Sequence, residues 1–295
     1  MSYRKAAVAG QFYPKNSSSL EEMIKTSFLD KKFGPGEDIQ TLNRDKRTII
    51  GGISPHAGYI YSGCCSAHTF LNLFKEKVPD TVIILGTDHI GYGGIALMNE
   101  GEWETPLGNL TIDTELSKII LDSSKTIKND ESAFTGYPFE REHNIEVQLP
   151  FIKYCSLGKD VKILPILMSI KKYNVLENVA DDITKALKTY KKDVIIVASS
   201  DMTHREINGA DHLNKFKKGD EKVIDAFTEL NPTKTLDAAL NTTVCGPQTI
   251  TSLLLIGKNL NATQGKLLKY YTSSEKTGNY YGYCVGYFSG IIIKQ

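Results

Sequence analysis

Three of the six histidines in the 295-residue sequence closely follow runs of apolar, mostly β-branched residues. The pairs are residues 48–54 with His56, residues 81–86 with His89, and residues 194–199 with His204. Continuous apolar runs of this length are typical of parallel strands that are covered on both faces. The carboxyl ends of parallel strands lie along one edge of a sheet, where α/β proteins bind ligands. We therefore expect the three imidazoles to converge, although each one alone could equally cap a helix or fill a loop.

Converging imidazoles would suit a transition-metal ion, because neutral imidazole is the commonest side-chain ligand of iron, copper, nickel and zinc. Two imidazoles would supply two ligands, and a third must come from elsewhere. Cys245 is the candidate, because it comes just before a predicted helix over residues 246–258. The free N–H groups and the dipole at such a helix start favour a thiolate and lower the pKa of a thiol. The alternative for Cys245 is a small buried residue before a turn, which is our interpretation of the other four cysteines.

Three more polar residues could support such a site. Asp201 could orient an imidazole, since a carboxylate partner fixes which ring nitrogen is free, or it could cap a following helix. His204, three residues further on, would then be the acid–base group. His143 comes just before a predicted amphipathic helix over residues 144–154. It is either a cap or surface residue, or a contact at the rim of the pocket.

The elements that must position these residues alternate along the chain, with no Pro/Ser-rich linker or repeat between them. The apolar runs predict strands over 48–54, 81–86, 161–168, 194–199 and 283–293, the last with an antiparallel partner at 267–271. Helical spacing of apolar residues predicts helices over 62–75, 113–122, 144–154, 175–190, 215–230 and 246–258. We therefore predict a single α/β domain over residues 1–295, with a mixed, mostly parallel sheet flanked by helices.

Composition excludes several classes of protein. The sequence is 41% hydrophobic and 23% charged, as globular proteins are, and this argues against disorder, collagen and coiled coils. With 35 Lys and Arg against 34 Asp and Glu, no basic excess favours nucleic-acid binding. No stretch approaches the roughly 18 apolar residues of a membrane span, and the start lacks the apolar segment of a signal peptide. An odd number of cysteines, five, then indicates free thiols, and we expect a cytoplasmic protein.

Short motifs that contain these residues are spread along nearly the whole chain. They are AGQFYP (9–14), PHAGYIYSG (55–63), LGTDH (85–89), TPLG (105–108), EHNIE (142–146), SSDMTH (199–204) and VCG (244–246). Together they make the sequence resemble the Memo family, whose microbial members are also called AmmeMemoRadiSam system protein B. The resemblance implies a fold similar to that of the class III non-haem iron extradiol dioxygenases, with a metal site in the matching pocket.

The resemblance also implies roles for individual residues. The two histidine ligands and one cysteine ligand of the family match His56, His89 and Cys245. His204 looks like the counterpart of the acid–base histidine of the dioxygenases, Asp201 matches the same pocket segment, and His143 looks like another pocket-lining histidine. The dioxygenases have a carboxylate where this chain has a thiol, which puts aromatic ring cleavage in doubt. We expect one transition-metal ion, with iron or copper favoured over zinc.

The loop before the second histidine departs from the family pattern. It often reads Gly-Pro-Asn/Ser-His, whereas here Asp88 precedes His89. The added carboxylate could lie close behind the ligand or could be a turn residue.

The sequence is compatible with three functions, and it does not decide whether the protein is an enzyme. The first is a metal-dependent redox or oxygen-linked protein that acts on an unknown small molecule, with His204 moving protons. The second is a non-catalytic module that retains the dioxygenase-like pocket and binds a peptide or partner. For microbial members, the resemblance implies a radical-SAM protein and an AmmeMemo-type protein as partners. The third is zinc-dependent hydrolysis with His204 as the base.

Overall fold

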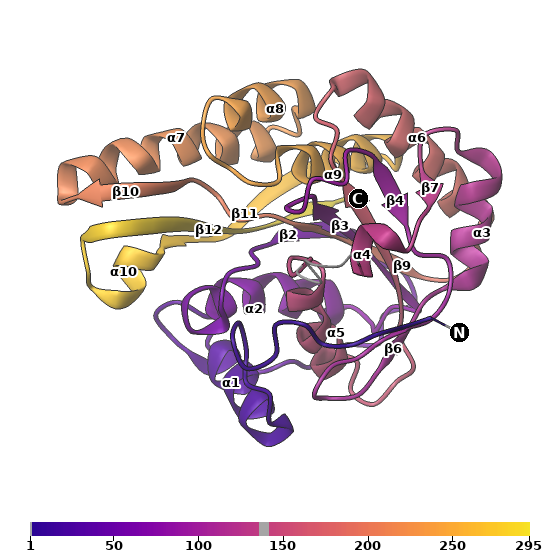
Figure 1. The fold of residues 1–295 in the computed structure, drawn as a ribbon, viewed down its shortest axis with the longest axis horizontal. Coiled ribbons are helices and arrows are strands. Elements are labelled where there is room, and N and C mark those ends of the chain that lie inside the picture. Colours follow the sequence, from indigo (N-terminus) through magenta and orange to yellow (C-terminus); the bar gives the residue numbers. More distant parts are fainter. Residues whose placement is uncertain (1, 136–141) are drawn as a thin grey trace.

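One large mixed β-sheet runs through the middle of the molecule (Figure 1). The structure is a computed structural model that describes residues 2–135 and 142–295. Four parallel strands form the centre of the sheet, in the spatial order β2 (Ile49–Ser54), β9 (Val194–Ser199), β3 (Thr81–Thr87) and β8 (Lys162–Met168). Antiparallel pairing extends it on one side through β12 (Tyr281–Ile293), β11 (Gln264–Thr272) and β10 (His204–Asn208). On the other side β4 (Ile95–Leu97) pairs antiparallel with β8, and β7 (Lys128–Asn129) pairs parallel with β4.

Helices cover both faces of this sheet, which confirms the predicted α/β architecture (Figure 1). One face carries α1 (Ser17–Leu29), α2 (Tyr59–Lys75) and α5 (Leu149–Cys155). The other carries α3 (Thr114–Ser123), α6 (Tyr173–Thr189), α7 (Ala210–Thr228), α8 (Pro232–Leu240) and α9 (Pro247–Asn259). Short elements complete the described chain: α4 (Ser132–Thr135), η1 (Glu146–Gln148), α10 (Ser273–Thr277) and a small sheet of β1 (Tyr3–Arg4), β5 (Glu102–Trp103) and β6 (Leu110–Thr111). None of the described helices is long and apolar enough to cross a lipid bilayer.

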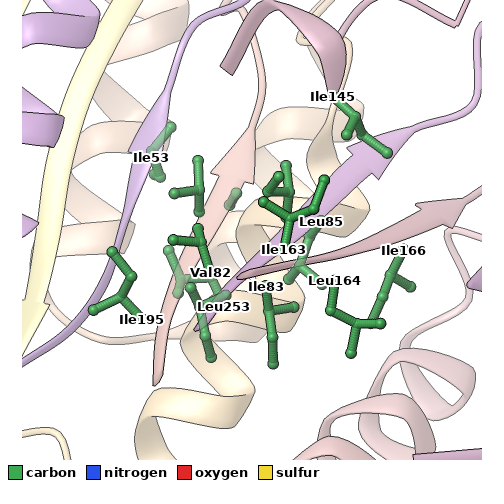
Figure 2. Close-up of a cluster of buried hydrophobic side chains, with 14 of the residues drawn as sticks. Ile53, Val82, Ile83, Leu85, Ile145, Ile163, Leu164, Ile166, Ile195 and Leu253 are labelled. Carbon is green, nitrogen blue, oxygen red and sulfur yellow. The ribbon is translucent and has the colours of Figure 1, made fainter. Parts of the chain in front are cut away.

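The central strands form where the sequence predicts them because they are apolar on both faces. All seven residues of β3 are buried, and β3 lies between β9 and β8. Figure 2 shows Val82, Ile83 and Leu85 of this strand among isoleucines and leucines of the neighbouring elements. Side chains packed on both faces fix the strands firmly, so that their carboxyl ends offer a rigid edge.

The sequence patterns miss other elements or misplace their limits. α1 and α8 are not predicted, and only four residues of α1 are buried, which leaves it a narrow apolar stripe. The helix predicted over 144–154 is instead η1 followed by α5, with Pro150 in the first turn of α5. After Asp201 the chain enters β10 and not a helix, so the alternative that Asp201 caps a helix is wrong.

A glycine at the end of β3 allows a second segment to approach the edge of the sheet. A Cβ atom on Gly86 would lie 2.5 Å from Cγ1 of Ile145 and 2.6 Å from Oδ1 of Asn144. Both distances are shorter than van der Waals contact, so only glycine allows the segment that follows His143 to pack here.

We expect Gly86→Ala to lower the free energy of unfolding by about 1–3 kcal/mol, because the added methyl group overpacks a rigid edge. Chemical denaturation of the purified protein measures this change. Gly58→Ala is the control, since a Cβ atom there meets its nearest neighbour at 3.6 Å, an ordinary contact. Equal stability of the two variants would contradict the account.

Candidate metal centre

The structure brings His56, His89 and Cys245 together, although they lie far apart in the sequence. One ligand atom of each, a ring nitrogen or the sulfur, lies within 4.8 Å of those of the other two. His56 follows β2, His89 follows β3, and Cys245 comes two residues before α9. Because β2 and β3 both pair with β9, their carboxyl ends are held side by side. Two imidazoles and one sulfur at this separation fit a transition-metal site.

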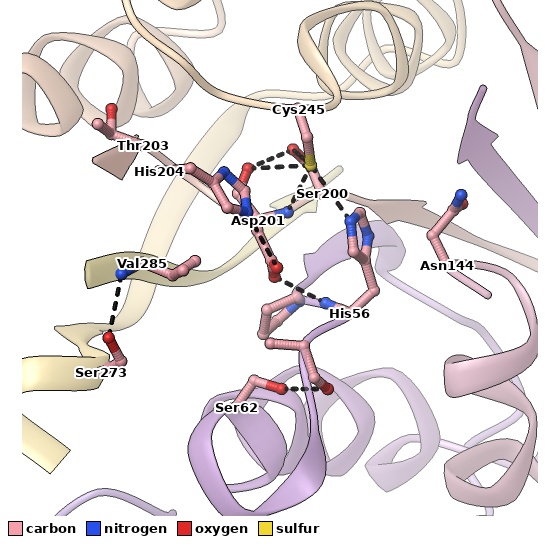
Figure 3. A network of polar contacts seen from close by, with 12 residues as sticks. His56, Ser62, Asn144, Ser200, Asp201, Thr203, His204, Cys245, Ser273 and Val285 are labelled. Atoms are coloured by element: carbon pink, nitrogen blue, oxygen red, sulfur yellow. Dashed lines mark hydrogen bonds and ion pairs between the residues drawn. The ribbon is translucent and has the colours of Figure 1, made fainter. Parts of the chain in front are cut away.

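His56 is fixed on three sides. Its backbone N–H donates to Oδ1 of Asp201 at 2.8 Å, and its Nδ1 lies 2.9 Å from Oγ of Ser199. Its Nε2 lies 3.2 Å from Sγ of Cys245 (Figure 3). Burial lowers the pKa of His56 well below its ordinary value, so its imidazole is neutral at neutral pH. A neutral imidazole is the form that binds metals.

The loop that carries His89 is organised by the carboxylate of Asp88. Its Oδ1 accepts hydrogen bonds from the backbone N–H groups of Ile90 and Gly91, both at 2.9 Å, and its Oδ2 accepts one from Ser169 Oγ at 2.6 Å. Asp88 is therefore a turn residue that shapes the loop. His89 itself is exposed to the cavity. Desolvation of its ring and the nearby His143 lower the pKa of His89, so that this imidazole is neutral too.

Cys245 points its sulfur into the same site. The backbone N–H of Asp201 donates to Sγ at 3.2 Å, and the carbonyl oxygen of Cys245 accepts a hydrogen bond from Thr87 Oγ1 at 2.9 Å. The prediction that the helix start lowers the thiol pKa is wrong for the metal-free protein. Burial of the thiol and the negative charge of Asp201 raise the pKa of Cys245 to about 12. Desolvation of the thiol outweighs the stabilisation of a thiolate by the start of α9, and a thiolate here needs a cation beside it.

Asp201 and His204 form a pair next to these ligands. Oδ2 of Asp201 lies 3.6 Å from Nε2 of His204. Burial alone would raise the pKa of Asp201, but His56 and His204 outweigh it and lower that pKa. Burial alone would also lower the pKa of His204, but the hydrogen bond and charge of Asp201 raise it above its ordinary value. His204 therefore gains a proton more readily than His56 or His89.

His143 lies beside the ligands as part of a stack of rings. Its ring is stacked on His89, with centroids 5.0 Å apart and an interplanar angle of 11°. Phe12 also contacts the His143 ring, at a centroid distance of 4.7 Å and an interplanar angle of 38°. The N-terminal segment that carries Phe12 is held by Glu146, which accepts hydrogen bonds from Arg4 Nη1 at 2.6 Å and Tyr13 Oη at 2.7 Å. His143 thus lines the pocket, as the resemblance implies.

A cavity of about 660 Å³ opens onto this group of residues. His56, His89, His143, Asp201 and His204 form its inner wall. The outer wall is formed by β12, α10 and the start of α2. Four tyrosines lie in it, Tyr61 of α2 and Tyr281, Tyr283 and Tyr287 of β12. Tyr281 and Tyr283 are 67% and 65% exposed, so they extend the wall outward past the mouth of the cavity.

The sequence patterns do not identify the residues that support the ligands or form the outer wall. Ser199, Asn144 and Gln148 are polar residues inside apolar or helical segments, and their role depends on contacts between distant parts of the chain. The tyrosines of β12 alternate along the strand, at positions 281, 283 and 287. Such alternation places them on one face of the strand and is a signal that could have indicated the outer wall.

We expect metal affinity to rise with pH, because Cys245 must lose its proton to bind while both imidazoles are already neutral. Titration of the metal-free protein with Zn²⁺, in two buffers of different ionisation enthalpy, measures the protons released. Cys245→Ser is expected to remove most of this pH dependence. Affinity that falls as pH rises would show that the assigned protonation states are wrong.

Asp201→Asn is expected to lower the pKa of His204, because the substitution removes the negative charge and keeps the oxygen that accepts from the His56 backbone. A pH titration of the His204 ring signals by NMR, in metal-free protein, measures the change. An unchanged His204 pKa would mean that the 3.6 Å contact has no electrostatic effect.

Comparison with known proteins identifies the family. A family model described as "Memo-like protein" matches residues 4–291. A MEMO1 family protein of Desulfurococcus amylolyticus is 38% identical to this chain, over 97% of this chain and 98% of its own length. A MEMO1 family protein of Thermotoga petrophila is 36% identical, over 98% of this chain and 99% of its own length. One solved structure, an uncharacterized protein (JW3007) of Escherichia coli K12, aligns with a TM-score of 0.42 at 11% identity, over 71% of this chain and 86% of its own. That likeness is too remote to carry an argument, so the similarity to dioxygenases stays a prediction. The extent and identity of the other matches show that the chain belongs to the Memo family.

Proposed function

We propose that this protein holds one iron or copper ion through His56, His89 and Cys245 and takes part in a redox or oxygen-linked reaction of a small molecule. The observation that carries the proposal is the grouping of the three ligand atoms within 4.8 Å, with His56 and His89 lining a cavity. When bound, such an ion would supply Lewis acidity and a change of oxidation state. A thiolate beside two imidazoles suits Cu(I), thiolate-bound iron and zinc. We prefer iron or copper because the proposed redox reaction needs an ion that changes its oxidation state, which Zn²⁺ does not do.

Other residues of the cavity have roles that suit this proposal. His204 can hold a proton on Nε2, next to Asp201, and give it to or take it from a molecule in the cavity. The tyrosine side chains of the outer wall can cover the bound molecule and keep water out. Among the described residues that line the cavity, none is a lysine or an arginine. This lining favours an uncharged substrate over a phosphorylated one, since phosphate groups are usually bound by those side chains.

Metal analysis tests the first part of the proposal. We expect protein purified without oxygen to contain iron or copper in stoichiometric amount, and His89→Ala and Cys245→Ser to lose most of it. His212→Ala is the matched control, because His212 is an exposed histidine of α7. The same metal content in His89→Ala as in the unaltered protein would contradict the assignment of the ligands.

The redox part needs a separate measurement. Electron paramagnetic resonance should show the bound ion changing oxidation state when the protein is reduced with dithionite and then exposed to oxygen. A content of zinc alone, together with ester or amide hydrolysis that does not depend on oxygen, would contradict the redox role and favour zinc-dependent hydrolysis.

The exposed aromatic rim favours a second candidate function, the binding of a protein partner. Tyr281 and Tyr283 leave about two thirds of their surface in solvent, and aromatic residues of this kind are enriched in protein interfaces. A radical-SAM protein and an AmmeMemo-type protein are the partners we propose to test. If partner binding is the main function, Tyr281→Ala and Tyr283→Ala should weaken the complex of the purified proteins while His56→Ala leaves it intact. Loss of the complex in a folded His56→Ala variant would favour the metal-dependent function.

A further inference from the structure

We infer that Ser199 is a positioning residue that keeps the ring proton of His56 on Nδ1 and thereby leaves Nε2 free for the metal. The inference rests on the metal site proposed above and adds the hydrogen-bond network that prepares one of its ligands. Ser199 is the last residue of β9 and is fully buried, between the ends of β2 and β3.

Three polar atoms lie within hydrogen-bond distance of the Ser199 hydroxyl. They are the carbonyl oxygen of Asn144 at 2.8 Å, Nε2 of Gln148 at 2.9 Å and Nδ1 of His56 at 2.9 Å. A hydroxyl group has one proton to donate and two lone pairs that accept. The carbonyl oxygen can only accept, so it takes the hydroxyl proton. The amide nitrogen of Gln148 can only donate, so its hydrogen bond uses one lone pair of the Ser199 oxygen.

The remaining lone pair of Ser199 can only accept, and this decides the state of His56. Nδ1 must carry a hydrogen in order to donate to it. In a neutral imidazole the other nitrogen, Nε2, then has a free lone pair. Nε2 is also the atom that faces Cys245, at 3.2 Å from Sγ. The network therefore directs the lone pair of His56 into the ligand cluster.

The orientation of Gln148 is fixed independently of Ser199. Its Nε2 also donates to the carbonyl oxygen of Pro55 at 3.0 Å and lies 3.4 Å from that of Asn144. Exchanging the amide oxygen and nitrogen would place an oxygen against both carbonyl oxygens, which is repulsive. Gln148, Asn144 and His56 are all buried, so bulk water does not substitute for these contacts.

The same segment also holds the strand that leads to His89. The side-chain oxygen of Asn144 accepts from the backbone N–H of Thr87 at 3.0 Å, and its amide nitrogen donates to the Thr87 carbonyl at 2.6 Å. Asn144 thus binds the end of β3 with its side chain and Ser199 with its backbone. One short segment sets the positions of both imidazoles relative to each other.

Nitrogen-15 NMR of metal-free protein labelled at its histidines tests the inference directly. We expect His56 to show a protonated Nδ1 and an unprotonated Nε2. In Ser199→Ala, Nδ1 loses its acceptor, so the form with the proton on Nε2 should become populated. We also expect the affinity for Zn²⁺, measured by competition with a chromogenic chelator, to fall roughly 10–100-fold, as it does when the partner of a ligating histidine is removed.

Ser289→Ala is the matched control. Ser289 is a fully buried serine of the same sheet, and its hydroxyl contacts Thr69 Oγ1 at 2.6 Å and makes no hydrogen bond to His56, His89 or Cys245. We expect this variant to keep the wild-type tautomer and Zn²⁺ affinity. The control separates the loss of a buried hydroxyl in general from the loss of this one.

Two results would overturn the inference. One is wild-type protein with the His56 proton on Nε2, a measurement that needs no variant to fold. The other is a folded Ser199→Ala variant with unchanged tautomer and affinity. Wild-type protein that binds no Zn²⁺, iron or copper but carries its proton on Nδ1 would overturn the proposed metal function and support the tautomer assignment.

Discussion

The polar groups at the carboxyl edge of the central strands are buried, and most of them find a hydrogen-bond partner within the protein, although Oε1 of Gln148 has none among the described residues. An unpaired polar group in such a place costs about 1–3 kcal/mol. Ser199, Asn144, Gln148 and Asp201 are each at most 3% exposed, yet all lie among apolar strands. Their hydrogen bonds to one another and to the backbone around His56 and His89 fix the imidazoles in place. The candidate metal site is thus a product of how the sheet edge satisfies its own hydrogen bonds.

The electrostatics of the site follow from the same burial. The low-dielectric surroundings disfavour charge, and so His56 stays neutral and Cys245 keeps its proton in the absence of a metal. Asp201 is an exception, because the backbone N–H of His56 and the side chain of His204 stabilise its carboxylate. A cation that entered the cluster would meet two neutral ligands and a thiol that it could deprotonate. The ligand side chains therefore carry no charge until an ion binds.

The sequence predicts the parallel strands and their end residues well, because a continuous apolar run has few alternative structures. From these strand ends, His56 and His89 could be expected to meet, and the motif around Cys245 pointed to the third ligand. Ser199 and Gln148 could not be identified, because a buried serine or glutamine has no periodic signature and its partner lies in a distant segment. The thiol pKa was also beyond reach, since it depends on how deeply Sγ is buried and on the carboxylate of Asp201.

The two walls of the cavity come from different parts of the chain. The inner wall is set by strands β2, β3 and β9 at the centre of the sheet, whereas much of the outer wall comes from α10 and the exposed start of β12 (Figure 1). The side chains at positions 281 and 283 face solvent and pack little against the body of the protein. Substitutions there can change what enters the cavity at little cost in folding, whereas substitutions of the buried polar residues around His56 would leave their partners unpaired. New binding preferences could thus arise through the exposed start of β12 alone, with the His56, His89 and Cys245 cluster left unchanged.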